Sequence, residues 1–304
     1  MALRKGIILA GETDRCVGTM CSGIPTQLLP VYDKPMIYYP LATLKQAGIV
    51  EILVVTAEDH LAALEDCIGD GQALGLRVSY QTQDDPRHLA QALTTAEGFL
   101  AGAPSALIYG DNLFAGPQFE GQLARASALA DRATIFAQTR DDPHDRAVIT
   151  CDWRGRATAV APRSQGSGSN LLITGLYLLD GDAPRRARSL VAAAPDAQIV
   201  RLLQGYLDDH LLNVEELAPC SAWFDAATPD NLLDAALYVR DRTIRGASPT
   251  SCIEDDAHRA GHIGVSQILA RTAGDCETTA AERPRQLAAT GTSTALATAI
   301  AAGA

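Results

Sequence analysis

Short apolar runs alternate with longer amphipathic stretches along residues 1–180. The runs are rich in Ile, Val and Leu and are bounded by Gly, Asp or Pro, which is typical of buried parallel strands. They predict strands at 6–10, 51–55, 77–81, 106–109 and 133–137, with helices between them at 36–47, 60–68, 89–100 and 118–130. Strands that alternate with helices in this way favour right-handed crossovers and a doubly wound, mostly parallel α/β sheet.

In a fold of this type, the loops that follow the strands contain the binding and catalytic residues. Ligands of doubly wound sheets bind beyond the carboxyl ends of the strands. We therefore expect the functional residues in the loops 11–27, 83–88 and 110–114.

The second half of the chain has a different pattern. A polar stretch at 155–170 precedes an apolar run at 171–179, which predicts a further strand. Beyond residue 194 the spacing predicts a mainly helical region, with helices at 197–209, 231–245 and 265–271. The Ala/Thr/Gly-rich end lacks clear periodicity, so we divide the chain into a domain at 1–272 and a tail at 273–304.

Composition narrows the classes of partner. The 304 residues include 25 basic and 36 acidic side chains, and 47% are hydrophobic, enough to form a core. The formal charge of −11 argues against a nucleic-acid partner, because binding to a phosphate backbone needs clustered Lys and Arg. No apolar run reaches the ~18 residues that span a bilayer, so we expect no membrane partner. The seven cysteines are scattered without a Cys-x-x-Cys pair, which favours free thiols in a reducing cytoplasm.

Two segments carry a highly specific pattern, Lys5-Gly-Ile-Ile-Leu-Ala-Gly11 and, at 27–44, Gln-Leu-Leu-Pro-Val-Tyr-Asp-Lys-Pro-Met-Ile-Tyr-Tyr-Pro-Leu-Ala-Thr-Leu. With Tyr-Gly-Asp-Asn-Leu-Phe at 109–114 and Trp-Phe-Asp at 223–225, the chain resembles the bacterial glucose-1-phosphate thymidylyltransferase family over residues 4–272. The resemblance implies the Rossmann-like nucleotidyltransferase fold with a helical C-terminal portion, and a homo-oligomer. It also implies a reaction in which a sugar phosphate attacks the α-phosphorus of a nucleoside triphosphate and pyrophosphate leaves.

The resemblance also implies a set of site residues. Asp111 and Asp225 match the two aspartates that hold Mg²⁺ in the family, so Mg²⁺ is the expected cofactor. The expected ligand-binding positions are Gly11 of the phosphate loop, Gln83 beside the base, and Gly175 and Tyr177 on the sugar-pocket strand.

The phosphate loop departs from the family pattern. The family has Gly-Gly-x-Gly-Thr-Arg-Leu and a lysine before the Gln-Leu-Leu-Pro element. Here Glu12 and Asp14 stand at glycine positions, Cys16 replaces the arginine and Thr26 replaces the lysine. Phosphoryl chemistry depends on positive charge and backbone N–H groups around the transferring group. Two carboxylates near the triphosphate, without the two cations, are expected to impair nucleotidyl transfer.

The segments that align with the family's sugar-binding elements also differ from the family pattern. The Glu-Lys-Pro element of the family aligns with Pro162-Arg163-Ser164, which keeps only the positive charge of Arg163. His88 replaces the glycine beside the nucleoside, where it is either a general acid/base or stacking group or an ordinary loop residue. The candidate catalytic set is therefore Asp111, Asp225, His88 and Arg163. A helix cap or turn is the alternative role for Asp111.

Three functional hypotheses follow. The first is an enzyme repurposed for different chemistry on a sugar-like or nucleoside-like small molecule in a biosynthetic pathway. The second is a catalytically silent homologue that binds a metabolite or an active partner subunit. The third is a true thymidylyltransferase with rebuilt contacts. An acid/base pair converging on the cleft would separate the first hypothesis from the second.

Overall fold

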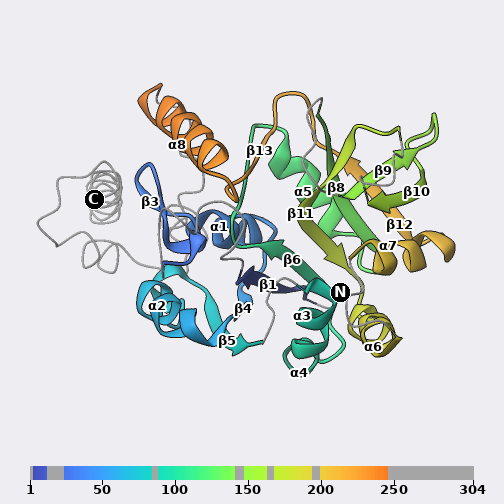
Figure 1. Cartoon of the computed structure of the whole chain (residues 1–304), viewed down its shortest axis with the longest axis horizontal. Helices are drawn as coiled ribbons and strands as arrows, with labels where there is room; N and C mark the ends of the chain where they lie inside the picture. The colour runs from blue at the N-terminus through green and yellow to red at the C-terminus, as the bar shows by residue number, and fades with distance from the viewer. Residues whose placement is uncertain are drawn as a thin grey trace, which may run out of the picture.

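A nine-stranded sheet forms the centre of the protein (Figure 1). The computed structural model describes residues 3–11, 24–83, 88–140, 147–162, 168–193 and 199–245. The strands of the sheet are β1 (Lys5–Ala10), β4 (Glu51–Thr56), β5 (Arg77–Thr82), β6 (Ser105–Tyr109), β8 (Ala133–Thr139), β9 (Ala147–Cys151), β10 (Ala157–Pro162), β11 (Leu171–Leu179) and β12 (Leu212–Glu216). Two ribbons accompany it, β2 (Pro30–Val31) with β3 (Lys34–Pro35) and β7 (Asn112–Ala115) with β13 (Ala222–Asp225).

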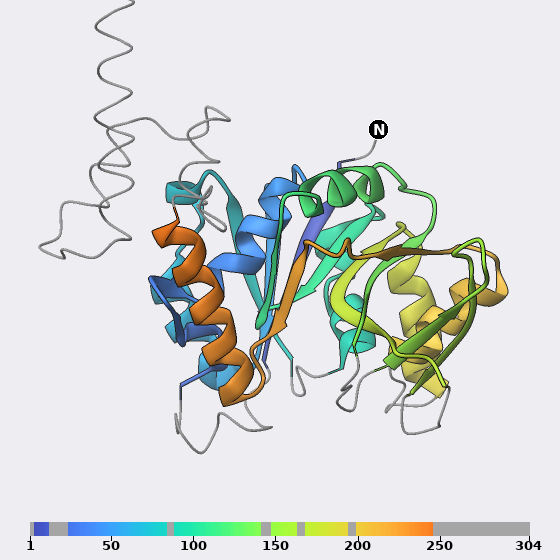
Figure 2. The same ribbon diagram turned by 90° about the horizontal axis from the view of Figure 1, so that it is seen from above.

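The helices cover the two faces of the sheet (Figure 2), except for the last one, which packs against β2 and β13. They are α1 (Tyr38–Gln46), α2 (Glu58–Ile68), α3 (Leu89–Thr95), α4 (Glu97–Leu100), α5 (Phe119–Ser127), α6 (Ala183–Ala193), α7 (Ile199–Asp208) and α8 (Pro229–Ile244). Within the described residues, no helix combines the length and the apolarity that crossing a membrane requires.

One half of the sheet is parallel. β6, β1, β4 and β5 lie side by side in this order, with Ile8 of β1 opposite both Val54 and Ile108. Strands β1 and β4 are buried on both faces and therefore consist of continuous apolar runs. The edge strand β5 instead alternates exposed and half-buried residues. The predicted doubly wound α/β fold is confirmed.

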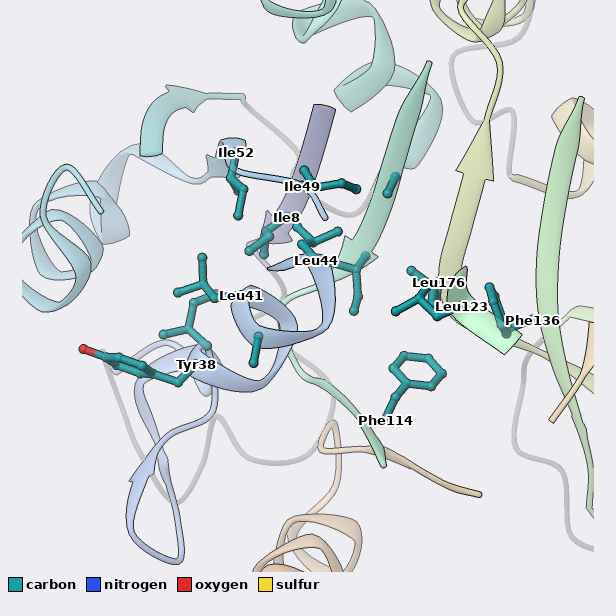
Figure 3. Packing of buried hydrophobic residues seen from close by; sticks show 14 of the residues in the cluster. Ile8, Tyr38, Leu41, Leu44, Ile49, Ile52, Phe114, Leu123, Phe136 and Leu176 are labelled. Atoms are coloured by element: carbon teal, nitrogen blue, oxygen red, sulfur yellow. The ribbon is translucent and has the colours of Figure 1, made fainter. Parts of the chain in front are cut away.

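The core consists of two main layers, one on each face of the sheet. Ile8 and Ala10 of β1 pack with residues of α1 and α5, whereas Ile7 and Leu9 pack with residues of α3, α6 and α7. Figure 3 shows the first layer, in which Ile8 lies close to Leu44 of α1. The alternation along β1 therefore places successive side chains in opposite layers.

The other half of the sheet contains antiparallel pairs. β11 runs antiparallel to β6 and β8, and β9 and β10 form an antiparallel pair at one end of the sheet (Figure 1). The segments 147–151 and 157–162 had not been predicted as strands. Their side chains are largely half-exposed, so they lack the apolar run that marks the buried strands.

The prediction of a mainly helical region beyond residue 194 is wrong in part. β12 adds to the sheet parallel to β8, and β13 pairs with β7. The residues of β12 are mostly half-buried, and β13 spans Ala222–Asp225 alone. Neither segment is long or apolar enough to reveal a strand without its partner.

The predicted helices form with shifted ends. The helix expected at 89–100 is interrupted at Ala96 and forms α3 and α4. The helix expected at 231–245 begins at Pro229, because Thr228 accepts a hydrogen bond from the Asn231 backbone N–H as an N-cap. The helix expected at 265–271 and the tail at 273–304 lie outside the described residues.

Arg4 ties three distant segments together just before β1. Its guanidinium donates to the carbonyl oxygens of Ser105 at 2.6 Å, Leu179 at 2.8 Å and Leu129 at 2.8 Å. Burial lowers the pKa of Arg4 to about 10, and the nearby Asp180 carboxylate opposes this shift. The Arg4 guanidinium thus donates hydrogen bonds to carbonyl groups of β6, of β11 and of the loop after α5 at the same time.

Candidate functional site

The β7–β13 ribbon brings the two predicted metal-binding aspartates together. β6 ends at Tyr109, and Gly110 and Asp111 lead directly into β7. Asp225 ends β13 opposite Asn112, and the backbone N–H of Ala226 donates to the carbonyl oxygen of Asp111 at 2.9 Å. Both residues are buried: Asp111 is only 3% exposed and Asp225 only 8%. The two aspartates therefore lie together at the carboxyl end of the parallel strand β6, which is where ligands of such sheets bind.

Each aspartate has a defined hydrogen bond. The side-chain amide of Asn112 donates through Nδ2 to Oδ1 of Asp111 at 2.7 Å. Oδ1 of Asp225 accepts from the backbone N–H of Ala227 at 3.3 Å. Both carboxylates thus accept hydrogen bonds from groups one or two residues away in the chain.

The donor set at this point fits Mg²⁺. Carboxylate oxygens are ligands that this hard cation prefers, and Mg²⁺ is commonly held by one or two carboxylates with water and substrate phosphates completing the shell. Across the described ranges, no cluster of three or more His, Cys, Asp or Glu side chains could hold a metal ion. Asp111 and Asp225 would therefore supply the protein part of the shell, and phosphate and water the rest.

Gly110 allows the loop to approach the end of β1 closely. A Cβ atom at this position would lie 2.8 Å from Cγ of Gln27 and 2.9 Å from the carbonyl oxygen of Leu9. The Gly110 N–H donates to that same Leu9 oxygen at 2.7 Å. Gly11, the predicted phosphate-loop glycine, is buried and follows β1 directly. The ends of β1 and β6, with the loops they lead into, are therefore adjacent.

Gln83 and His88 lie together at the end of β5. The Gln83 side chain donates through Nε2 to the carbonyl oxygen of His88 at 3.5 Å, and His88 immediately precedes α3. The backbone N–H of Gln83 donates to the carbonyl oxygen of Thr56 at the end of β4. The two predicted nucleoside-side residues therefore share one edge of the fold.

The two residues predicted on the sugar-pocket strand, Gly175 and Tyr177, have different surroundings. A Cβ atom on Gly175 would lie 2.5 Å from Oδ1 of Asn112 and 2.6 Å from Cδ2 of Tyr109, so this glycine packs against the residue beside Asp111. Tyr177 is 3% exposed and belongs to the apolar core. Its ring lies edge-on to Tyr109 with the centroids 6.3 Å apart. Gly175 thus lies against Asn112, the neighbour of Asp111, whereas Tyr177 lies within the core.

We expect Gly175→Ala to lower the free energy of unfolding by about 1–3 kcal/mol, because the new methyl group must displace Asn112 or Tyr109. Urea denaturation measures the change. Gly205→Ala in α7 is the matched control, since nothing lies within 4 Å of its Cβ position. A helical Gly→Ala change in open space should stabilise by up to about 1 kcal/mol. Equal effects of the two substitutions would contradict this account of Gly175.

Every lysine of the chain has a partner within the protein. The sequence contains three lysines. Lys5 pairs with Glu51, Lys34 lies beside Asp33 and over the Tyr39 ring, and Lys45 donates to a backbone carbonyl oxygen. Thr26, which the resemblance aligns with the family's lysine, is buried in a short 3₁₀ helix.

Four predicted residues cannot be placed. Arg163, Glu12, Asp14 and Cys16 lie outside the described residues.

Sequence reasoning did not single out Asn112, Trp223 or Arg140. Trp223 donates through Nε1 to Oδ1 of Asn112 at 2.6 Å, and Arg140 donates to the backbone carbonyl oxygen of Trp223 at 2.5 Å. Asn112 follows Asp111 directly and Trp223 lies two residues before Asp225. Their closeness to the two aspartates in the sequence was the signal that could have identified both.

The comparisons with known proteins agree with this geometry. A family model described as "Nucleotidyl transferase" matches residues 5–242. The glucose-1-phosphate thymidylyltransferase of Xanthomonas campestris pv. campestris is 37% identical over 269 residues, which cover 88% of this chain and 91% of that protein. The Mycobacterium tuberculosis glucose-1-phosphate thymidylyltransferase is 39% identical over 268 residues, 88% and 93% of the two chains.

Solved structures show the same relationship. A Bacillus anthracis protein assigned as a glucose-1-phosphate thymidylyltransferase, in complex with a sucrose, superposes with a TM-score of 0.70 at 28% identity, covering 78% of this chain and 96% of that chain. A UDP-glucose pyrophosphorylase complexed with UDP-glucose has a TM-score of 0.65 at 18% identity, covering 79% and 99%, and shares the fold. The chain therefore belongs to the nucleotidyl transferase family, as a homologue of the glucose-1-phosphate thymidylyltransferases.

Proposed function

We propose that this protein binds a sugar-like or nucleoside-like small molecule, with Mg²⁺ held by Asp111 and Asp225, and that it is repurposed away from efficient thymidylyl transfer. One observation carries the proposal. The carboxylate pair for the cation is retained and buried, whereas the family's lysine position holds Thr26 and each lysine is engaged elsewhere.

The charge requirement of nucleotidyl transfer supports this assignment. Attack on the α-phosphorus builds negative charge on the phosphate oxygens and on the departing pyrophosphate. Fixed cations and N–H donors stabilise that charge, and one lost donor costs about 10²–10³ in rate. With Cys16 and Thr26 at the family's arginine and lysine positions, this chain lacks two such donors.

The remaining residues divide the work of binding. Asp111 and Asp225 would hold the cation, which supplies partial neutralisation of a bound phosphate. Gln83 and His88 lie where the nucleoside side of the ligand is expected, and the Gln83 amide offers hydrogen-bond donors and an acceptor. Gly11 carries no side chain and so leaves room for a ligand at the end of β1. Gly110 instead lets the loop after β6 pack closely against Gln27 and Leu9.

Ligand preference tests the proposal. Glu12 and Asp14, at the family's glycine positions, would each cost a triphosphate about 1–2 kcal/mol at roughly 4–8 Å and an effective dielectric of about 20–40. Thymidine lacks this penalty. We therefore expect thymidine to bind at least as tightly as dTTP in calorimetric titrations with and without Mg²⁺.

A charge-neutralised variant is the matched control for this titration. Glu12→Gln combined with Asp14→Asn should strengthen dTTP binding by roughly tenfold or more and leave thymidine binding unchanged. Micromolar binding of dTTP by the natural chain without measurable thymidine binding would contradict the proposal. That result would favour an active thymidylyltransferase with a rebuilt phosphate loop.

A further inference from the structure

We infer that Asn112, oriented by Trp223, is a positioning residue that holds the Asp111 carboxylate for its cation. The inference rests on the proposed Mg²⁺ site at Asp111 and Asp225. It adds a second layer of residues whose contribution can be measured separately from the ligands themselves.

The chemistry of the indole group determines how the Asn112 amide must point. Trp223 Nε1 can only donate, and it lies 2.6 Å from Asn112, so the amide oxygen Oδ1 must face it. The amide nitrogen Nδ2 is then directed to Oδ1 of Asp111, at 2.7 Å. If the Asn112 amide were reversed, its NH₂ group would face the indole N–H of Trp223, and its oxygen would face the Asp111 carboxylate. Neither pair could form a hydrogen bond. The three side chains therefore form a relay with one direction.

The ribbon register explains why these residues meet. Asn112 lies opposite Asp225 in the antiparallel pair, and Trp223 lies two residues before Asp225 on the same face of β13. Asn112 is fully buried and Trp223 is 2% exposed, so water does not compete for these groups. Hydrogen bonds in such surroundings are costly to break without a replacement partner.

Two neighbours hold Trp223 and Asn112 in place. The Arg140 guanidinium lies 4.9 Å from the centre of the Trp223 ring and donates to the Trp223 backbone carbonyl oxygen at 2.5 Å. Gly175 provides the space that Asn112 occupies, because a Cβ atom there would lie 2.5 Å from Oδ1. The position of the amide is thus fixed by Gly175 of β11 and Trp223 of β13, and Arg140 just after β8 holds Trp223.

The functional consequence is preorganisation of one metal ligand. A carboxylate restrained by a second residue loses less conformational freedom when a cation binds. Groups that orient metal ligands in this way are worth about 10–100-fold in metal affinity. Asn112 and Trp223 would contribute in this manner without contacting the cation.

Trp223→Phe is the direct test, because it removes the indole N–H and keeps an aromatic ring beneath Arg140. We expect calorimetry with Mn²⁺ on the full chain to give a dissociation constant about 10–100-fold higher for Trp223→Phe. Trp153→Phe is the matched control. Trp153 is 85% exposed in the β9–β10 turn, and its substitution should leave Mn²⁺ binding unchanged.

A second measurement does not depend on the stability of the Trp223 variant. The chain has two tryptophans, so Trp153→Phe leaves Trp223 as the sole indole fluorophore. Because its N–H is linked through Asn112 to Asp111, adding diamagnetic Mg²⁺ should change the Trp223 emission. The same addition to Trp153→Phe/Asp111→Asn should cause no change.

The outcomes separate the inference from the proposed function. If the natural chain and Asp111→Asn bind Mn²⁺ equally, the metal site itself is wrong. If Asp111→Asn loses binding while a folded Trp223→Phe keeps its affinity within about twofold, the site stands and the relay is overturned. Metal binding to Trp153→Phe without a change in Trp223 emission would also overturn the relay.

Discussion

Purified protein supplied with dTTP, glucose 1-phosphate and Mg²⁺ is expected to release pyrophosphate about 10⁴-fold more slowly than an active relative. The expectation follows from the proposed function, in which Cys16 and Thr26 are aligned with the family's arginine and lysine. Each lost donor costs about 10²–10³ in rate, and the combined loss is less than the product because such effects are not additive. A coupled pyrophosphate-release assay measures the rate.

The positive control for this assay is the glucose-1-phosphate thymidylyltransferase of Xanthomonas campestris, which is 37% identical to this chain. We do not expect another lysine to take over the role of the family's lysine, because Lys5, Lys34 and Lys45 each bind a different partner. Turnover near ~10 s⁻¹, the median for enzymes, would show that the chain stabilises the transferring phosphate by other groups. Repurposed chemistry would then be the wrong assignment.

Arg4→Met is expected to lower the free energy of unfolding by about 3 kcal/mol. The substitution removes the donor for the carbonyl oxygens of Ser105, Leu179 and Leu129, all within 2.8 Å of the guanidinium. A buried acceptor without a donor costs about 1–3 kcal/mol, and relief of the arginine's own desolvation offsets part of the sum. Thermal unfolding should show a midpoint lower by roughly 6–12 °C.

Arg77→Met is the matched control for Arg4. The Arg77 side chain is 68% exposed and pairs with Glu51 at the surface of the sheet. Surface ion pairs contribute about 0–1 kcal/mol, so the midpoint should move little. Equal destabilisation by the two substitutions would show that Arg4 does not hold β6, β11 and the loop after α5 together.

The local pattern of the sequence was sufficient to predict the parallel half of the fold. β1 and β4 are covered on both faces, and burial on both faces requires continuous apolar runs that are visible without any structure. The apolar run of β6 also predicted the position of Asp111. The loop at the carboxyl end of a strand begins where the apolar run stops, and Asp111 lies in that loop. Resemblance to the family then supplied Asp225, Gln83 and Gly175.

The strands that were missed depend on partners far away in the chain. β12 forms beside β8, and β13 forms beside β7. Edge and ribbon strands are only partly buried, so their side chains need not be continuously apolar. Their hydrogen-bonding partners, rather than their own residues, determine that they are extended.

The same distinction applies to the candidate site, where the two aspartates could be predicted from the sequence but their contacts with Asn112 and Trp223 could not. A conspicuous motif marked Asp111 and Asp225, and their residue types already indicated a cation. Only the tertiary structure decided that Trp223 and Asn112 meet, because their hydrogen bond joins residues 111 positions apart. Arg4 likewise reaches carbonyl groups of β6 and β11 that no local pattern connects with it. Apolar periodicity is a local consequence of burial, whereas a directional hydrogen bond exists only after the chain has brought both groups to the same place.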